Sequence, residues 1–124
     1  MLLVEDSEDN RMLILAYLKR TPHQVEIAEN GQIAVDRFTT GEFDLVLMDM
    51  QMPVMDGYSA TRAIREWELQ NGLARTPIIA LTAHALFGDA EKSAEAGCDA
   101  HLTKPIKKAT LLEELERFAR KVKS

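Results

Sequence analysis

Five side chains that could take part in metal or phosphate chemistry stand at the ends of short apolar runs: Glu5, Asp6, Asp49, Thr82 and Lys104. The clearest run, residues 45–48, has strand length and leads into a loop that contains Pro53 and Gly57. In open α/β sheets, ligands bind at the carboxyl ends of the strands, where the strand order reverses. We therefore expect these side chains to meet at one edge of a sheet.

The acidic members of this set predict a cation site. Two carboxylates about 4 Å apart repel each other by roughly 4 kcal/mol at an effective dielectric constant near 20. Glu5, Asp6 and Asp49 would therefore favour a bound cation, and a few hard oxygen ligands with room for water suit Mg²⁺, or Mn²⁺. A simpler interpretation also stays open, in which Glu5 and Asp6, with Glu8 and Asp9, place negative charge at a helix amino terminus.

Thr82 and Lys104 add hydrogen-bond donors to the same edge. A hydroxyl and an ammonium both donate to phosphoryl oxygens. Three carboxylates carry a charge of −3, whereas Mg²⁺ and Lys104 together carry +3, so the site approaches neutrality only with the metal bound. We predict that Asp49 is a nucleophile that forms an acyl phosphate, and that this phosphoryl transfer requires Mg²⁺.

Apolar patterning predicts the elements that position these residues. Strands are expected at residues 2–4, 25–28, 45–48, 77–81 and 100–103. Helices are expected from a cap at Asp6 or Ser7 to Thr21-Pro22, between Asn30-Gly31 and Gly41, and over 58–69, 90–96 and 107–121. In the first helix Met12, Leu15 and Leu18, with Ile14 beside them, recur at helical spacing. The continuous apolar strands predict an α/β fold, a (βα)5 doubly wound parallel sheet.

Composition limits the class of protein. The 124 residues fit one domain, and the net charge of −5 argues against a nucleic-acid surface. No apolar run approaches the roughly 20 residues of a membrane-spanning helix, and the opening Met-Leu-Leu-Val is too short for a signal peptide. The default compartment is therefore the cytoplasm. The single Cys98 excludes an internal disulfide, and we expect it to be a half-buried thiol in a loop.

Four motifs together resemble the receiver domain of bacterial two-component response regulators. They are Leu3-Val4-Glu5-Asp6, the stretch from Asp49 to Gly57, Leu81-Thr82-Ala83, and Lys104-Pro105-Ile106. They stand in order at compatible spacing and cover essentially the whole chain. The resemblance implies a flavodoxin-like five-stranded parallel sheet of order 2-1-3-4-5.

The resemblance also implies roles for residues at the acidic end of the site. Asp49 matches the phosphoacceptor, which takes a phosphoryl group from a phosphohistidine on a partner. Asp6 matches the direct Mg²⁺ ligand, and Glu5 matches an acidic neighbour that acts largely through water. The backbone carbonyl of Gln51 matches a further metal ligand.

Further roles follow for residues around the phosphoryl group. Thr82 matches the switch hydroxyl, and Ala83 matches a small residue whose backbone N–H contacts the phosphoryl group. Lys104 matches the counter-charge of that group, and the Lys104-Pro105 peptide bond matches one that is typically cis in the family. His101 stands at a switch position that usually holds Tyr or Phe. Gln51 and His84 match positions that tune how fast water attacks the acyl phosphate, and we predict that they set its lifetime.

The residues of these motifs, especially from Met50 to Gly57, resemble receivers of hybrid sensor histidine kinases more than those of transcription factors. We therefore expect residues 1–124 to be a single receiver domain excised from a larger protein, which could be the cytoplasmic part of a membrane-anchored kinase. The expected partners are a histidine kinase or histidine phosphotransfer domain as donor, and a downstream protein on the face of the fourth helix, fifth strand and fifth helix. Neither nucleic acid nor membrane contact is expected of this domain.

Other classes remain open. The chain could be a stand-alone single-domain regulator, or a binding module that works without phosphorylation. An aspartyl-phosphate hydrolase of the haloacid dehalogenase type would want a second Asp where Gln51 stands. A flavodoxin-type flavin binder needs a neutral phosphate loop, whereas residues 5–9 are mostly acidic.

Overall fold

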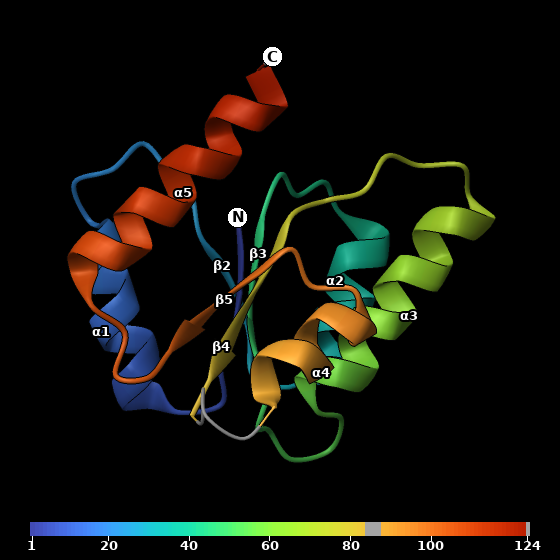
Figure 1. Cartoon of the computed structure of the whole chain (residues 1–124), viewed down its shortest axis with the longest axis horizontal. Helices are drawn as coiled ribbons and strands as arrows, with labels where there is room; N and C mark the ends of the chain where they lie inside the picture. The colour runs from blue at the N-terminus through green and yellow to red at the C-terminus, as the bar shows by residue number, and fades with distance from the viewer. Residues whose placement is uncertain (84–87, 124) are drawn as a thin grey trace.

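Five short parallel strands form one sheet, in the order β2-β1-β3-β4-β5, in the computed structural model of the chain (Figure 1). The structure describes residues 1–83 and 88–123, with the backbone alone at 89–90 and 119–123. The strands are β1 (Leu2–Val4), β2 (Glu26–Ala28), β3 (Val46–Asp49), β4 (Ile78–Thr82) and β5 (Ala100–Thr103). The predicted fold class and strand order are therefore confirmed.

Five helices alternate with these strands: α1 (Glu8–Leu18), α2 (Gly31–Thr40), α3 (Gly57–Gln70), α4 (Asp89–Ala96) and α5 (Lys108–Lys123). Polar side chains cap three of them. Ser7 Oγ accepts from Asn10 N at 3.4 Å, Asn30 Oδ1 from Ile33 N at 2.9 Å, and Asp56 Oδ1 from Ser59 N at 2.8 Å. The predicted helices are all present, and their ends agree with the prediction to within three residues.

The sheet is covered on both faces (Figure 1). Alternate side chains of β1, β3 and β4 point to opposite sides. Leu3, Leu47 and Ile79 pack against α1 and α5, whereas Leu2, Met48 and Ile78 pack against α2 and α3. Every residue of these three strands is buried, as the continuous apolar runs predict for a parallel sheet.

Two expectations about individual side chains are corrected. Met12 is 62% exposed, whereas Ile14 and Leu18 are buried against the sheet. A residue two positions from Ile14 lies about 200° around the helix and so faces solvent. Cys98 is buried rather than half-buried; its Sγ lies 3.7 Å from Thr61 Oγ1, and burial raises the pKa of the thiol.

The start of α3 packs directly on the chain that follows β3. Gly57 N donates to Met50 O at 3.2 Å, and a Cβ at Gly57 would lie 2.2 Å from Asp49 O. Only a residue without a side chain allows this approach. None of the helices in the described part of the chain is long and apolar enough to span a membrane.

Candidate functional site

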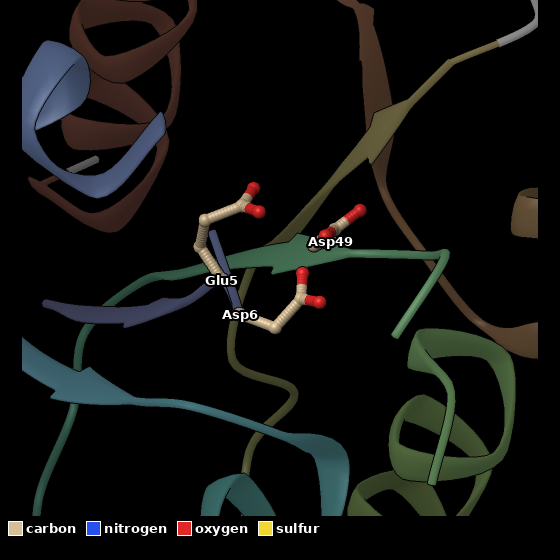
Figure 2. A group of neighbouring side chains, drawn as sticks. All are labelled: Glu5, Asp6 and Asp49. Carbon is tan, nitrogen blue, oxygen red and sulfur yellow. The ribbon is translucent and has the colours of Figure 1, made fainter. Parts of the chain in front are cut away.

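Three carboxylates gather at the carboxyl ends of β1 and β3 (Figure 2). The register pairs Val4 with Met48, so Glu5 follows β1 beside Asp49, the last residue of β3. Carboxylate oxygens of Glu5, Asp6 and Asp49 lie within 4.8 Å of one another. Glu5 and Asp49 are buried and Asp6 is exposed. The sheet register thus joins residues that are distant in sequence.

Lys104 supplies a cation to two of these carboxylates. Its Nζ lies 3.1 Å from Glu5 Oε2 and 3.1 Å from Asp49 Oδ1, and the lysine side chain is 22% exposed. Burial disfavours the ammonium, but the negative charges of Asp49 and Glu5 outweigh it and raise the pKa of Lys104. Lys104 is therefore charged at neutral pH. We call Glu5, Asp6, Asp49 and Lys104 the carboxyl-end cluster.

The negative charge of Asp49 is incompletely compensated. Burial and then the charge of Glu5 raise the pKa of Asp49 from 3.8 to about 7, although Lys104 acts in the opposite direction. Oδ1 accepts from Gln51 N at 3.2 Å, whereas Oδ2 is buried without a hydrogen-bond partner among the described residues. Such an atom needs a cation, a proton or a covalent partner.

The donor set fits a small hard cation. Three carboxylates and one ammonium leave a formal charge of −2 in the carboxyl-end cluster. The carboxylate of Asp6 is exposed and has no partner within the described ranges, so it is free to bind a metal. Oxygen ligands from a few carboxylates, with access to water, are the set that Mg²⁺ prefers.

Hydrogen-bond donors stand beside the acidic residues. Thr82 ends β4, and its buried Oγ1 has no partner in the part of the chain that the structure describes. Ala83 N donates to the side-chain Oε1 of Gln51 at 3.3 Å. From sequence, Gln51 was expected to offer its backbone carbonyl to the metal and to influence the lifetime of the acyl phosphate. Nothing in the sequence pattern indicates this side-chain contact.

The remaining predicted site residues differ in what the structure gives for them. His101 lies on β5, paired in register with Ala80, and its side chain is exposed. His84 lies outside the described residues. Lys104 N donates to Thr82 O at 2.7 Å, and the Lys104-Pro105 peptide bond is cis, as expected.

A second charged cluster, which the sequence analysis missed, lies near the amino end of β4. It comprises Arg65, Glu68, Arg75 and Asp99, and we call it the amino-end cluster. Arg65 Nη1 donates to Glu68 Oε1 at 2.7 Å, and Arg65 Nη2 donates to Asp99 Oδ2 at 2.8 Å. Arg75 Nε donates to Asp99 Oδ1 at 2.8 Å.

Backbone groups complete the amino-end cluster. Thr76 N donates to Glu68 Oε2 at 2.7 Å, and Ile78 N donates to Asp99 Oδ2 at 2.9 Å. All four carboxylate oxygens of Glu68 and Asp99 therefore accept a hydrogen bond. Two sequence signals indicate part of this cluster: Glu68 stands four residues after Ile64, on the buried side of α3, and three residues after Arg65, at helical spacing.

Comparison with known proteins identifies the family. The profile of the response regulator receiver domain matches residues 1–116, and the chain belongs to this family. It is 40% identical over 119 residues to hybrid signal transduction histidine kinase M of Dictyostelium discoideum, and 42% identical over 112 residues to the sensor protein GacS of Pseudomonas syringae pv. syringae. The alignments cover 94% and 90% of this chain but only 5% and 12% of those two proteins.

Solved structures agree with this assignment. The receiver domain of sensor histidine kinase PA1611 from Pseudomonas aeruginosa PAO1, with magnesium in its active-site cleft, is 44% identical, with a TM-score of 0.85 over 94% of this chain and 93% of that one. The Saccharomyces cerevisiae receiver domain of Ssk1, solved with the histidine phosphotransfer protein Ypd1, is 35% identical, with a TM-score of 0.87 over 91% of this chain and 83% of that one.

Proposed function

We propose that this receiver domain accepts a phosphoryl group from a phosphohistidine onto Asp49, in a Mg²⁺-dependent step of a two-component phosphorelay. The observation that carries the proposal is the carboxyl-end cluster. In it, a buried carboxylate lies 3.1 Å from an ammonium and beside two further carboxylates, and one of its oxygens has no hydrogen-bond partner among the described residues. This arrangement supports an anionic nucleophile that needs positive charge before it can approach a phosphate.

The proposed chemistry is a single displacement at phosphorus. Asp49 Oδ2 forms a P–O bond while the P–N bond to the donor imidazole breaks, and the electron pair of that bond stays on the imidazole nitrogen, which takes up a proton. The product is an acyl phosphate on Asp49 and a free histidine. Lys104, beside Oδ1, would donate to the phosphoryl oxygens and offset their charge.

A metal ion would be held by the same acidic end. Glu5, Asp6, Asp49 and the carbonyl of Gln51 are the proposed ligands, and Mg²⁺ bound there would neutralise charge on the carboxylates and the phosphoryl oxygens. The magnesium in the cleft of the PA1611 receiver supports this assignment. Asp49 Oδ2, which lacks a partner in the part of the chain that the structure describes, and the exposed Asp6 carboxylate also support it.

The buried hydroxyl of Thr82 supports a role in signalling the modification. Thr82 Oγ1 and the N–H of Ala83 would both donate to the phosphoryl group, so Gln51 Oε1 must first release Ala83 N. This movement would shift the population of conformations at the face of α4, β5 and α5, where His101 is exposed and a downstream protein would dock. Gln51 and His84 would then set the lifetime of the acyl phosphate.

The relatives support a proposal for the parent protein and for the phosphoryl donor. The chain spans 5% of a hybrid signal transduction histidine kinase and 12% of a sensor protein, at 40% and 42% identity. We therefore propose that it is the receiver domain of a hybrid sensor histidine kinase. The complex of the Ssk1 receiver with Ypd1 supports a histidine phosphotransfer domain or a histidine kinase as the donor.

Intact mass after incubation with acetyl phosphate tests the proposal. We expect one phosphoryl adduct on the wild type with Mg²⁺, and none in EDTA or on Asp49→Asn. The amide keeps the shape of the side chain but cannot act as the nucleophile. An adduct that persists on Asp49→Asn would place the acceptor elsewhere. Absence of an adduct, both with acetyl phosphate and with a phosphorylated histidine phosphotransfer domain, would contradict the proposal.

A further inference from the structure

We infer that Arg11 is a positioning residue for the metal-binding loop, an inference that rests on the proposed function of the carboxyl-end cluster. One guanidinium nitrogen, Arg11 Nη1, donates to Glu5 O at 3.0 Å and to Asp6 O at 3.1 Å. Arg11 is half-buried on the first turns of α1. It contacts the backbone of two of the three carboxylate residues but none of their carboxylate oxygens.

These two bonds fix the backbone on both sides of Asp6. Glu5 O belongs to the peptide plane before the Cα of Asp6, and Asp6 O belongs to the plane after it. Because each peptide unit is planar, holding both carbonyls restricts the two rotatable dihedrals at Asp6. The direction of the Asp6 Cβ, and with it the reach of the carboxylate, is thereby set.

Asp6 needs such support more than its neighbours do. Glu5 is held by its buried side chain, with Oε1 accepting from Ser7 N at 3.2 Å and Oε2 3.1 Å from Lys104 Nζ. Within the described residues, the exposed Asp6 carboxylate has no partner, and Arg11 is the side chain bonded to the Asp6 backbone. The position of this carboxylate therefore depends on Arg11.

Arg11 is anchored firmly enough to act in this way. Its own backbone N donates to Ser7 O at 3.0 Å, in the first turn of α1, and Ser7 Oγ caps the same turn through Asn10 N. The backbone bond to Ser7 O, the Ser7 cap and the two guanidinium bonds therefore tie the first turn of α1 to residues 5–7. Residues that orient metal ligands typically change metal affinity by about 10- to 100-fold when they are replaced.

The direction in which Mg²⁺ affinity changes distinguishes a positioning role of Arg11 from a purely electrostatic one. A guanidinium beside a cation site repels the metal, so loss of its charge alone would tighten Mg²⁺ binding. Loss of an orienting contact would weaken it. Arg11→Met removes both charge and donors, whereas Arg11→Lys keeps the charge but replaces the planar guanidinium with a single ammonium. The two variants therefore distinguish the explanations.

Titration calorimetry with Mg²⁺ tests the inference, with the unfolding transition of each variant followed in EDTA. We expect Arg11→Met to raise the Kd about tenfold, and Arg11→Lys to raise it to a similar extent. The control is Arg20→Met, because Arg20 is exposed and has no partner among the described residues; its Kd should match the wild type. Asp6→Asn is the reference for loss of a ligand and should bind most weakly.

Several outcomes would overturn the inference. A Kd for Arg11→Met that equals or lies below that of the wild type would overturn it, whatever the effect of the substitution on stability. An equally weakened Mg²⁺ affinity in Arg20→Met would also overturn it. If the wild type binds Mg²⁺, Asp6→Asn does not, and both Arg11 variants bind normally, this inference alone fails. If the wild type itself binds no Mg²⁺, the proposed metal site fails and the inference with it.

Discussion

The two charged clusters differ in how completely their charges are satisfied. The amino-end cluster pairs two carboxylates with two guanidinium groups, and every carboxylate oxygen accepts a hydrogen bond. The carboxyl-end cluster sets three carboxylates against one ammonium and leaves Asp49 Oδ2 buried without a partner in the described part of the chain. A balanced cluster stabilises the fold, whereas an unbalanced one retains the capacity to bind and react.

The largest predicted effect concerns Arg65 in the amino-end cluster. Its side chain is 12% exposed and bridges Glu68, Asp99 and the chain before β4. Arg65→Met would leave two carboxylates without this cation, and we expect the free energy of unfolding to fall by about 3 to 5 kcal/mol. Urea denaturation measures the change. The control is Arg62→Met, an exposed site on the same helix, which should change stability by less than about 0.5 kcal/mol. A similar small change in Arg65→Met would contradict the structural role.

The next effect concerns Lys104, the one cation of the carboxyl-end cluster. Lys104→Met should slow labelling of Asp49 by acetyl phosphate by about 10²- to 10³-fold, because the phosphoryl oxygens lose their counter-charge. Intact mass against time gives the rate. Lys107→Met, at an exposed position three residues on, is the matched control. Equal rates for the two variants would show that Lys104 is dispensable.

Replacing Asp by Asn should have opposite effects on stability in the two clusters. Because the pKa of Asp49 is raised to about 7, the folded state binds more protons than the unfolded state between pH 4 and 7, and stability falls as pH rises through this range. Asp49→Asn removes this pH-dependent loss of stability. It should raise the free energy of unfolding of the metal-free protein by about 2 kcal/mol at pH 8, but by little at pH 4.

Asp99→Asn should instead destabilise the protein, by about 2 kcal/mol, because it weakens the charged hydrogen bonds from Arg65 and Arg75. Urea unfolding of both variants in EDTA, at pH 4 and pH 8, tests the pair. Changes of the same sign at pH 8 would remove the distinction between the two clusters.

The smallest effect is stabilisation by the metal itself. At ten times its Kd, Mg²⁺ should raise the free energy of unfolding by about 1.4 kcal/mol. The increment should persist in Arg65→Met, which leaves the carboxyl-end cluster intact, and should disappear in Asp6→Asn. Thermal unfolding with and without Mg²⁺ measures it. An increment that survives in Asp6→Asn would indicate binding at another site.

The carboxyl-end cluster was predictable from sequence because each of its residues ends a strand or follows one closely. Apolar runs locate the ends of parallel strands, and these ends share one edge of the sheet. The strand order, the burial of β1, β3 and β4, and the meeting of Glu5 with Asp49 are all confirmed. The functional roles assigned to these residues remain predictions.

The amino-end cluster was only partly predictable. Helical spacing on α3 brings Arg65 and Glu68 together, three residues apart. Arg75 lies in the loop after α3 and Asp99 follows α4, so only the three-dimensional fold brings these two residues to the pair. The exposure of Met12 was missed for a related reason. Several apolar residues of α1 share a helical spacing, and only packing against the sheet decides which of them are buried.

The distribution of the carboxyl-end cluster along the chain links its chemistry to folding. Glu5, Asp49 and Lys104 follow or end three different strands. Lys104 follows β5, and its backbone N donates to Thr82 O at the end of β4, so Lys104 reaches its position only when β5 has paired with β4. A partly folded chain in which β5 has not yet joined β4 has no ammonium between Glu5 and Asp49. In such a chain the two carboxylates would repel each other and the incoming phosphate. Incompletely folded molecules would therefore not accept a phosphoryl group.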